Sequence, residues 1–160
     1  MSDQLPEYPS ADLSVEELLL LHLNARNQTA VLLSEVVFGV PVLIDASATN
    51  IHQAPRNSTI RMSSTPDARR AFDTELHYNR IFIPNLFYGR DHVLSGQPTS
   101  TRDLAPQLAA ISGMPISAED LVDRPIDGAG VWPLVVDVEA HPESRTYFGL
   151  ERFTVTGAAP

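Results

Sequence analysis

Five histidines are the residues of this 160-residue chain with the most versatile chemistry, because imidazole titrates near neutral pH and binds metal ions. They are His22, His52, His77, His92 and His141. No two of them have the i, i+4 spacing that places a pair of imidazoles on one helix face around zinc. The chain also has no cysteine, which excludes thiolate ligands, disulfides and cysteine nucleophiles. We therefore expect no metal site and no cofactor.

Asp91 and His92 are the residues best placed for catalysis, because an acid beside a histidine can move protons. One such pair is a weak signal, and other catalytic patterns are absent. No serine stands in a GxSxG turn, and the segment 127–130 lacks the lysine and threonine of a phosphate-binding loop. We expect no catalytic residue, no small-molecule substrate and no enzyme. An enzyme with a site near Asp91 and His92 is the third of three alternatives.

Carboxylates occur in pairs at 16–17 and 119–120, where two acids could act as general acid and base. Each pair follows a serine, so the more natural prediction places it in the first turn of a helix, where its charge complements the helix dipole. Ser14 and Glu17 have the spacing of a capping box, and Ser117 with Asp120 marks another capped start. These carboxylates are expected to be structural.

The apolar pattern predicts helices joined to strand hairpins. Helices are expected over residues 15–26 and 103–111, the second with Asp103 as N-cap, Pro106 in its first turn and Gly113 after its end. Short helices are expected at 34–37 and between Ser117 and Pro125. Strands are expected at 42–44, 58–64, 76–83, 134–138 and 146–156. The last two, joined by a turn at 141–144, form the strongest predicted hairpin.

The sequence resembles itself at an offset of 85 residues. Without a gap, Leu19, Leu23, Ala25, Val31, Glu35, Val36 and Val37 align with Leu104, Leu108, Ala110, Ile116, Asp120, Leu121 and Val122. Each copy ends in an aromatic strand, in which Arg80 and Arg152 are expected at equivalent places. The predicted fold is α+β, with two related small modules, each a capped helix plus an antiparallel β-hairpin, packed as one compact unit. Chance similarity is the alternative to duplication.

The predicted organisation follows from this repeat: an extended N-terminal arm at 1–12, module 1 at 13–83, a connector at 84–102, module 2 at 103–156 and a tail at 157–160. The arm is expected either to be disordered or to dock on a neighbouring subunit. Module 1 has a longer loop around Ile51–Asn57 than module 2, and the segment 127–130 is expected to be a turn.

Charge narrows the range of partners. All 11 basic residues are arginine, and with 20 acidic residues the net charge is −9, which disfavours nucleic acid and offers no basic stripe to a membrane. The longest apolar run, Leu18–Leu21, is far shorter than the ~20 residues of a membrane-spanning helix, and the acidic start is not a signal peptide. We expect a soluble protein with no membrane contact.

Three stretches carry a family resemblance: DLAPQLAAISGMPISAEDLVDRPI from Asp103, RNSTIRM from Arg56 and HYNRIFI around Arg80. They resemble a module, often repeated, of virion structural proteins of large, phiKZ-like tailed bacteriophages. The two copies would cover residues 13–156. The resemblance implies a component of the tail, baseplate or head–tail region, assembled in the host cytoplasm and bound to other virion proteins and to copies of itself. It implies no catalytic residue.

Aromatic residues and arginines are expected to make these contacts, because both dominate protein interfaces. The candidates are Tyr78, Arg80, Phe87, Tyr88, Trp132 and Arg152. At each position a core role or an intramolecular ion pair is the alternative. The alternative function is a small binding or adaptor domain outside any particle.

Overall fold

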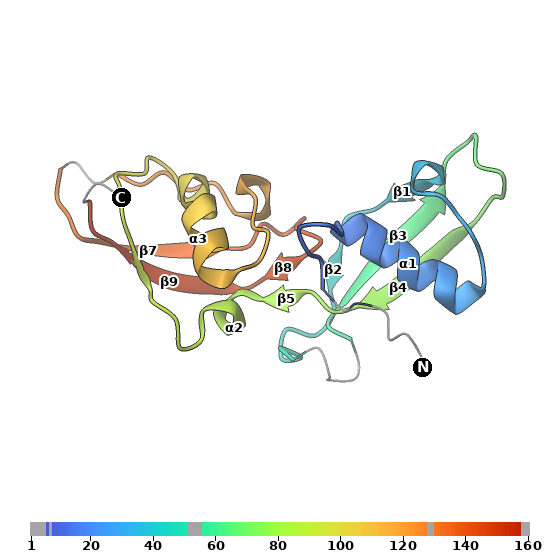
Figure 1. The fold of residues 1–160 in the computed structure, drawn as a ribbon, viewed down its shortest axis with the longest axis horizontal. Coiled ribbons are helices and arrows are strands. Elements are labelled where there is room, and N and C mark those ends of the chain that lie inside the picture. The colour runs from blue at the N-terminus through green and yellow to red at the C-terminus, as the bar shows by residue number, and fades with distance from the viewer. Residues whose placement is uncertain (1–5, 7, 51–55, 128–129, 158–160) are drawn as a thin grey trace. The chain divides into compact units, whose positions relative to one another are not determined.

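The chain folds into two compact units, residues 1–80 and 81–160 (Figure 1). The structure, a computed structural model, describes residues 6, 8–50, 56–127 and 130–157. Helices and strands occur in both units, so the predicted α+β class is confirmed. Each unit is described by itself below.

The described residues of unit 1 form one α-helix, one 3₁₀ turn and four strands. They are α1 (Val15–Asn27), η1 (Leu33–Glu35), β1 (Val36–Phe38), β2 (Val42–Leu43), β3 (Ser58–Ser64) and β4 (Asp73–Tyr78). The strand β3 is central and pairs antiparallel with the other three. Because β4 occupies one side of β3, β1 and β2 share the other side and form one interrupted edge.

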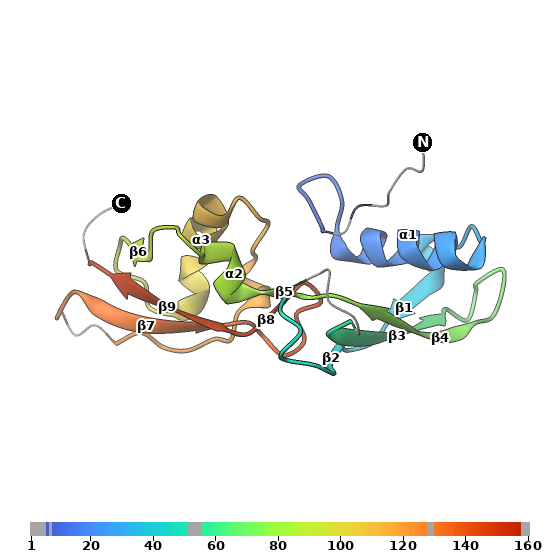
Figure 2. The same ribbon diagram turned by 90° about the horizontal axis from the view of Figure 1, so that it is seen from below.

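The helix α1 begins as the sequence predicts. The backbone N–H of Ser14 donates to the Glu17 carboxylate at 2.9 Å, and the Glu17 N–H donates to the Ser14 hydroxyl at 3.2 Å. One face of the sheet is covered by α1 (Figure 2). The core between them consists of Leu19, Leu20, Leu23, Val36, Ile60, Met62 and Leu76. The other face carries no helix among the described residues of unit 1.

Unit 2 has more, shorter elements. They are β5 (Ile81–Phe82), α2 (Ile83–Phe87), β6 (Val93–Leu94), η2 (Thr101–Leu104), α3 (Ala105–Ser112), η3 (Ala118–Asp120), β7 (Leu134–Glu139), β8 (Tyr147–Phe148) and β9 (Leu150–Val155). The strand β9 pairs antiparallel with β7 and parallel with β6, whereas β5 pairs parallel with β8. The strong hairpin predicted from the sequence is thus present as β7 and β9.

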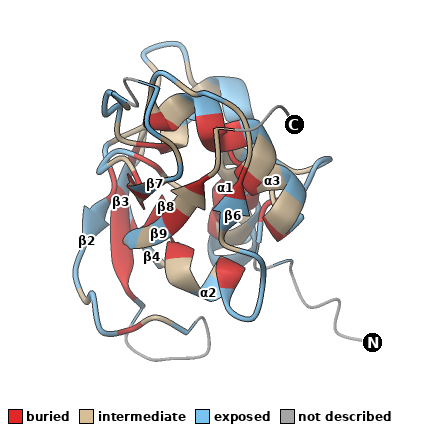
Figure 3. Ribbon diagram, turned by 90° about the vertical axis from the view of Figure 1, so that its left-hand side faces the viewer, coloured by how far each residue is buried: buried red, intermediate tan, exposed pale blue. Residues whose placement is uncertain are grey.

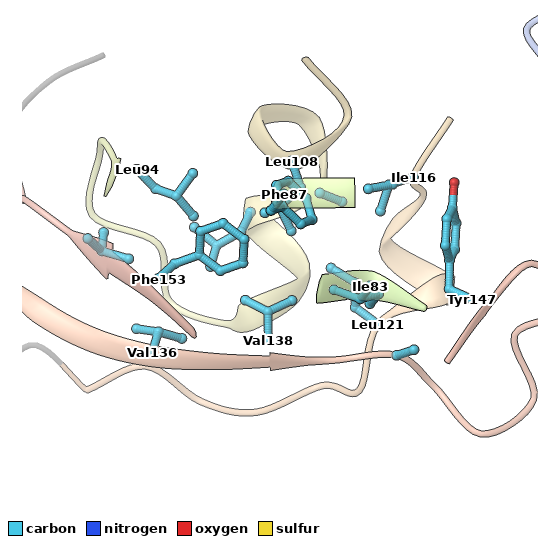
Figure 4. Packing of buried hydrophobic residues seen from close by; sticks show 14 of the residues in the cluster. Ile83, Phe87, Leu94, Leu108, Ile116, Leu121, Val136, Val138, Tyr147 and Phe153 are labelled. Atoms are coloured by element: carbon cyan, nitrogen blue, oxygen red, sulfur yellow. The ribbon is translucent and has the colours of Figure 1, made fainter. Parts of the chain in front are cut away.

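The core of unit 2 packs between these strands and the helices α2 and α3 (Figure 4). The rings of Phe87 and Phe153 meet edge to face with centroids 4.9 Å apart. Leu104 and Leu108 add apolar surface from η2 and α3. Gly113 ends α3 with φ 72°, a left-handed conformation that glycine adopts without steric cost, as predicted.

Several predicted elements are wrong in detail. The expected helix at 34–37 is the 3₁₀ turn η1 followed directly by strand β1. Asp103 is not an N-cap: Ser100 caps η2, and the Asp103 carboxylate accepts the Ser100 N–H at 2.9 Å as the acidic member of that capping box. The supposed short helix after Ser117 is only the turn η3.

The strand expected over 76–83 is interrupted. β4 ends at Tyr78, β5 then pairs with β8, and Ile83 already begins α2, where Pro84 fits the first turn because a proline N–H is not needed there. The expected connector 84–102 contains α2, β6 and part of η2. Four predictions fall partly on residues that the structure does not describe. They are the N-terminal arm at 1–12, the longer loop of module 1 around 51–57, the turn at 127–130 and the tail at 157–160.

Arg80 and Arg152 are not equivalent, which corrects the sequence alignment of the two copies. Arg80 follows the end of β4 and is buried, whereas Arg152 lies within β9 and is exposed. The Arg80 guanidinium Nε donates to the Ser58 hydroxyl at 2.9 Å, and burial lowers the pKa of Arg80 from its usual value. Arg80 thus belongs to the interior of unit 1.

Candidate interaction surface

Exposed apolar side chains gather on one segment of unit 1. Seven of the exposed large hydrophobic residues lie between positions 32 and 44: Leu32, Leu33, Val37, Val40, Val42, Leu43 and Ile44. We call these seven residues the apolar edge, because they follow η1 and the edge strands β1 and β2. Scattered exposed apolar residues are ordinary, but a contiguous group marks an interaction surface.

The geometry of the sheet explains this exposure. Successive side chains of a strand point to opposite faces, so Val36 and Phe38 pack under α1 while Val37 points to the face without a helix. Val37 is 51% exposed and Val42 is 56% exposed. In Figure 3, β2 is largely pale blue next to the red strand β3.

The edge is irregular between β1 and β2. Val36 lies opposite Ser64 and Val42 opposite Thr59, so six steps along the edge match five along β3. The extra residue is a β-bulge at 39–41, where the Gly39 N–H still donates to the Arg61 carbonyl at 2.9 Å. Pro41 has no N–H to offer. Bulge and proline both make this edge a poor template for a continuous strand ladder.

The apolar edge carries no unpaired charge. Its segment contains one ionisable residue, Glu35, whose carboxylate accepts from the Arg69 Nε at 2.7 Å and from the Leu32 N–H at 2.9 Å. The hydrogen bond from the Arg69 side chain is the main cause that lowers the pKa of Glu35 to about 2, and the hydrogen bonds from the backbone N–H groups of Leu32 and Arg69 lower it further. Glu35 is therefore ionised at physiological pH, and because its charge is balanced by that of Arg69, the pair adds no net charge to the edge.

Charged side chains gather on the same open face of the sheet, on the strands β3 and β4. Arg61 on β3 donates to Asp73 on β4 at 2.8 Å through its Nε, and His77 lies 3.2 Å from Glu75. The open face of unit 1 thus carries Val37 and Val42 on its edge strands and charged side chains on β3 and β4, whereas Leu43, opposite Ser58, points to the α1 side.

Unit 2 covers the strand edge in the corresponding position of its own sheet. The segment 121–126 runs beside β7, since Leu121 bridges Ala140. Its outer side is paired with residues 99–101: the Thr101 N–H donates to the Arg124 carbonyl at 2.9 Å, and the Ile126 N–H donates to the Thr99 carbonyl at 2.8 Å. In the described part of unit 1, β1 and β2 pair with β3 alone.

An open groove of about 280 Å³ lies in unit 2 between residues 124–127 and β7. Two of the charged side chains that line it are paired with side chains on the strands: Arg124 pairs with Glu139, and Asp137 pairs with Arg152 at 2.7 Å. The groove therefore presents no spare charge from these residues to a ligand.

The interface residues expected from the sequence are scattered. Phe87 is only 1% exposed and belongs to the core of unit 2, whereas its neighbour Tyr88 is 90% exposed. Trp132 packs partly buried against the core of unit 2, and Tyr78 does the same in unit 1. Together with the buried Arg80, Phe87 is unavailable to a partner, which corrects two of the six candidates.

Asp91 and His92 do not form a proton-transfer pair. The Asp91 carboxylate accepts the Val93 N–H at 3.0 Å, and His92 places its Nδ1 3.0 Å from the Arg90 carbonyl. The imidazole stacks on Phe153 at 5.3 Å between centroids. Each group thus has a local partner, and Nε2 of His92 lies 3.8 Å from Oε1 of Glu151 rather than against Asp91. Among the described residues, no three acidic or histidine side chains converge as a metal site would require.

The apolar edge was missed in the sequence because the segment was divided into a short helix at 34–37 and a brief strand at 42–44, and was not treated as one edge. A signal was present: residues 36–44 read VVFGVPVLI, with no charge and with Gly39 and Pro41 in the middle. Glycine and proline inside a strand-like run indicate an edge or a bulge rather than a central strand. A search for apolar runs on such edges would have found it.

Comparison with known proteins assigns the chain to one family. A family model matches residues 10–160, almost the whole length, and describes a family of unknown function. No curated protein and no solved structure matches the chain. No helix in the described ranges is long and apolar enough to cross a bilayer.

Proposed function

The chain belongs to the family of unknown function DUF7941, and we propose that it is a structural component of a multi-copy particle that acts through protein–protein contacts. The observation that carries this proposal is the apolar edge, which exposes seven large hydrophobic residues on one neutral segment. Such a surface fits a permanent partner, because leaving it in water costs free energy that burial at an interface recovers.

A relationship between the two halves of the chain would support an assembly role, and the 3₁₀ turns favour such a relationship. An offset of 85 residues maps η1 onto η3. In η1 the Leu32 N–H donates to the Glu35 carboxylate at 2.9 Å, and in η3 the Ser117 N–H donates to the Asp120 carboxylate at 3.0 Å. Each turn leads directly into an edge segment beside a hairpin. The same 3₁₀ turn, closed by a hydrogen bond from a backbone N–H to a carboxylate, thus occurs twice at the spacing of the sequence repeat.

The hairpins β3–β4 and β7–β9 are also alike in one respect, because each has an arginine opposite a carboxylate, but the strands that carry the two residues are exchanged. At the middle of the first hairpin Arg61 lies opposite Glu75, and at the middle of the second Asp137 lies opposite Arg152. The positive residue is on the first strand in one unit and on the second strand in the other. The two units would therefore present different charge patterns to neighbours, which suits an assembly built from non-identical contacts.

The particle that we propose is a bacteriophage virion, with the chain in its tail, baseplate or head–tail region. This part of the proposal rests on the sequence resemblance to the virion module. Its partners would be other virion proteins and copies of itself, and it would reach the virion after synthesis in the host cytoplasm.

Peptide mass fingerprinting of purified particles and of their dissected tails tests the proposal. We expect peptides of this chain in washed particles, at a stoichiometry that is constant between preparations. Their absence from particles, with the protein recovered as a free monomer, would favour the adaptor domain instead.

A further inference from the structure

We infer that the apolar edge binds the same edge of a second copy of this chain, so that two copies form a two-fold dimer. This inference rests on the proposed function and names the first contact of the assembly. Three observations support it: among the described residues β1 and β2 pair with β3 alone, their segment carries no net charge, and the chain as a whole has a net charge of −9.

The first step is the contrast between the two units. In unit 2 the strand edge at 121–126 is covered by residues 99–101 of the same chain through two backbone hydrogen bonds. The Thr101 hydroxyl adds a third, to the Val122 carbonyl at 2.6 Å. In unit 1 the described residues before α1 make other contacts: Ser10 bridges Leu13, and the Pro6 carbonyl lies 3.0 Å from Nε2 of His22 on α1. Among the described residues of unit 1, β1 and β2 pair with β3 alone, so a second molecule can pack on the exposed side chains of the apolar edge.

The second step is electrostatic. Two copies of a chain with net charge −9 repel each other, and the repulsion is smallest where the facing surfaces carry no charge. The apolar edge meets this condition, since its one carboxylate, Glu35, is neutralised by Arg69. A basic partner would find no carboxylate to bind here. The surface that matches an apolar, neutral patch is another such patch, and a second copy supplies it.

The third step concerns how the two edges meet. A two-fold axis places a patch against itself, which requires no second complementary surface. The Val36 N–H already donates to the Leu33 carbonyl, and Pro41 has none, so a continuous shared ladder is not available. The contact is therefore packing of Val37, Val40 and Val42 across the axis, with burial of apolar surface as its driving force.

The full chain tests this through its mass in solution. Sedimentation equilibrium of the wild type is expected to give twice the chain mass with a concentration-dependent dissociation. The double variant Val37→Glu/Val42→Glu is expected to be a monomer, because it places four carboxylates in the dimer contact. The milder Val37→Thr/Val42→Thr keeps the shape of the strand and is expected to raise the dissociation constant by about tenfold or more.

Val135→Glu is the matched control. Val135 lies on β7 of unit 2 and is 67% exposed, so it offers a similar valine outside the apolar edge. This variant is expected to dimerise like the wild type. Circular dichroism melting of all variants separates a lost contact from a lost fold. The inference is overturned by a monomeric wild type, by a folded Val37→Glu/Val42→Glu variant that still dimerises, or by a Val135→Glu variant that does not.

Cross-linking gives an independent measurement, because the chain contains no cysteine of its own. Val40→Cys, treated with a short bismaleimide, is expected to yield a covalent dimer. Tyr88→Cys, at a more exposed position outside the edge, is expected to yield a much smaller amount. Equal yields would contradict the inference. Particle analysis separates the two proposals: a chain found in particles but monomeric alone refutes only the dimer, and a dimer never found in particles refutes only the virion role.

Discussion

The hydroxyl of Tyr147 donates a 2.8 Å hydrogen bond to the carbonyl oxygen of Pro115, which ties strand β8 to the segment between α3 and η3. The side chain is fully buried, and this burial, with a smaller contribution from the Asp120 charge, raises the pKa of Tyr147 above its usual value. The phenol therefore remains a hydrogen-bond donor over the physiological pH range.

Replacing Tyr147 by phenylalanine is expected to lower the free energy of unfolding by about 0.5–1.5 kcal/mol, because the ring packing stays and one hydrogen bond is lost. Urea denaturation followed by circular dichroism measures the change. Tyr88→Phe is the control, since Tyr88 is almost fully exposed and its hydroxyl should contribute little. A Tyr147→Phe variant as stable as the control would show that the bond contributes nothing to stability.

The ion pair between Glu35 and Arg69 predicts a specific pH dependence. The pKa of Glu35 is about 2 in the folded chain and ordinarily near 4.5, so the carboxylate stabilises the fold above pH 4.5. This contribution is lost as the pH falls from there toward 2. The melting temperature of wild type should exceed that of Glu35→Gln at neutral pH, and the difference should shrink to nothing near pH 2. A difference independent of pH would contradict this account.

The elements that the sequence predicted well are those specified locally. The capping box of Ser14 and Glu17 places the start of α1, and the alternation at 58–64 gives β3, because each signal lies within a few residues. The strand β5 could not be found this way. It has two residues, and its partner β8 lies more than sixty residues along the chain, so no periodicity reveals it.

The candidate interface residues were harder to predict for a related reason. Phe87 and Tyr88 are adjacent aromatics, and the sequence alone does not distinguish the buried ring from the exposed one. The distinction depends on the direction in which the five-residue helix α2 meets β9, and this is a tertiary contact. The apolar edge was missed because an exposed valine and a core valine have the same signature in one sequence.

Gly149 separates β8 from β9 and should not tolerate a side chain. Its φ is 92°, and a Cβ at this position would lie 2.5 Å from Cε2 of Phe82. Gly149→Ala is expected to lower stability by about 1–3 kcal/mol through backbone strain, with a further loss from the clash. Gly89→Ala separates the two effects, because Gly89 also has a positive φ, 70°, but open space around it. Equal losses in the two variants would mean that Phe82 moves aside without cost.

Phe87 and Tyr88 offer a direct test of core against surface. Phe87→Ala is expected to lower the free energy of unfolding by about 3–5 kcal/mol, because it leaves a cavity beside Phe153 and removes their edge-to-face contact. Tyr88→Ala, one residue away, is expected to leave stability nearly unchanged, so any loss of binding that it causes can be assigned to a contact with a partner. The two variants are compared by urea denaturation at neutral pH. A stable Phe87→Ala variant would mean that the ring lies outside the core, and the packing of α2 on β9 would then have to be revised.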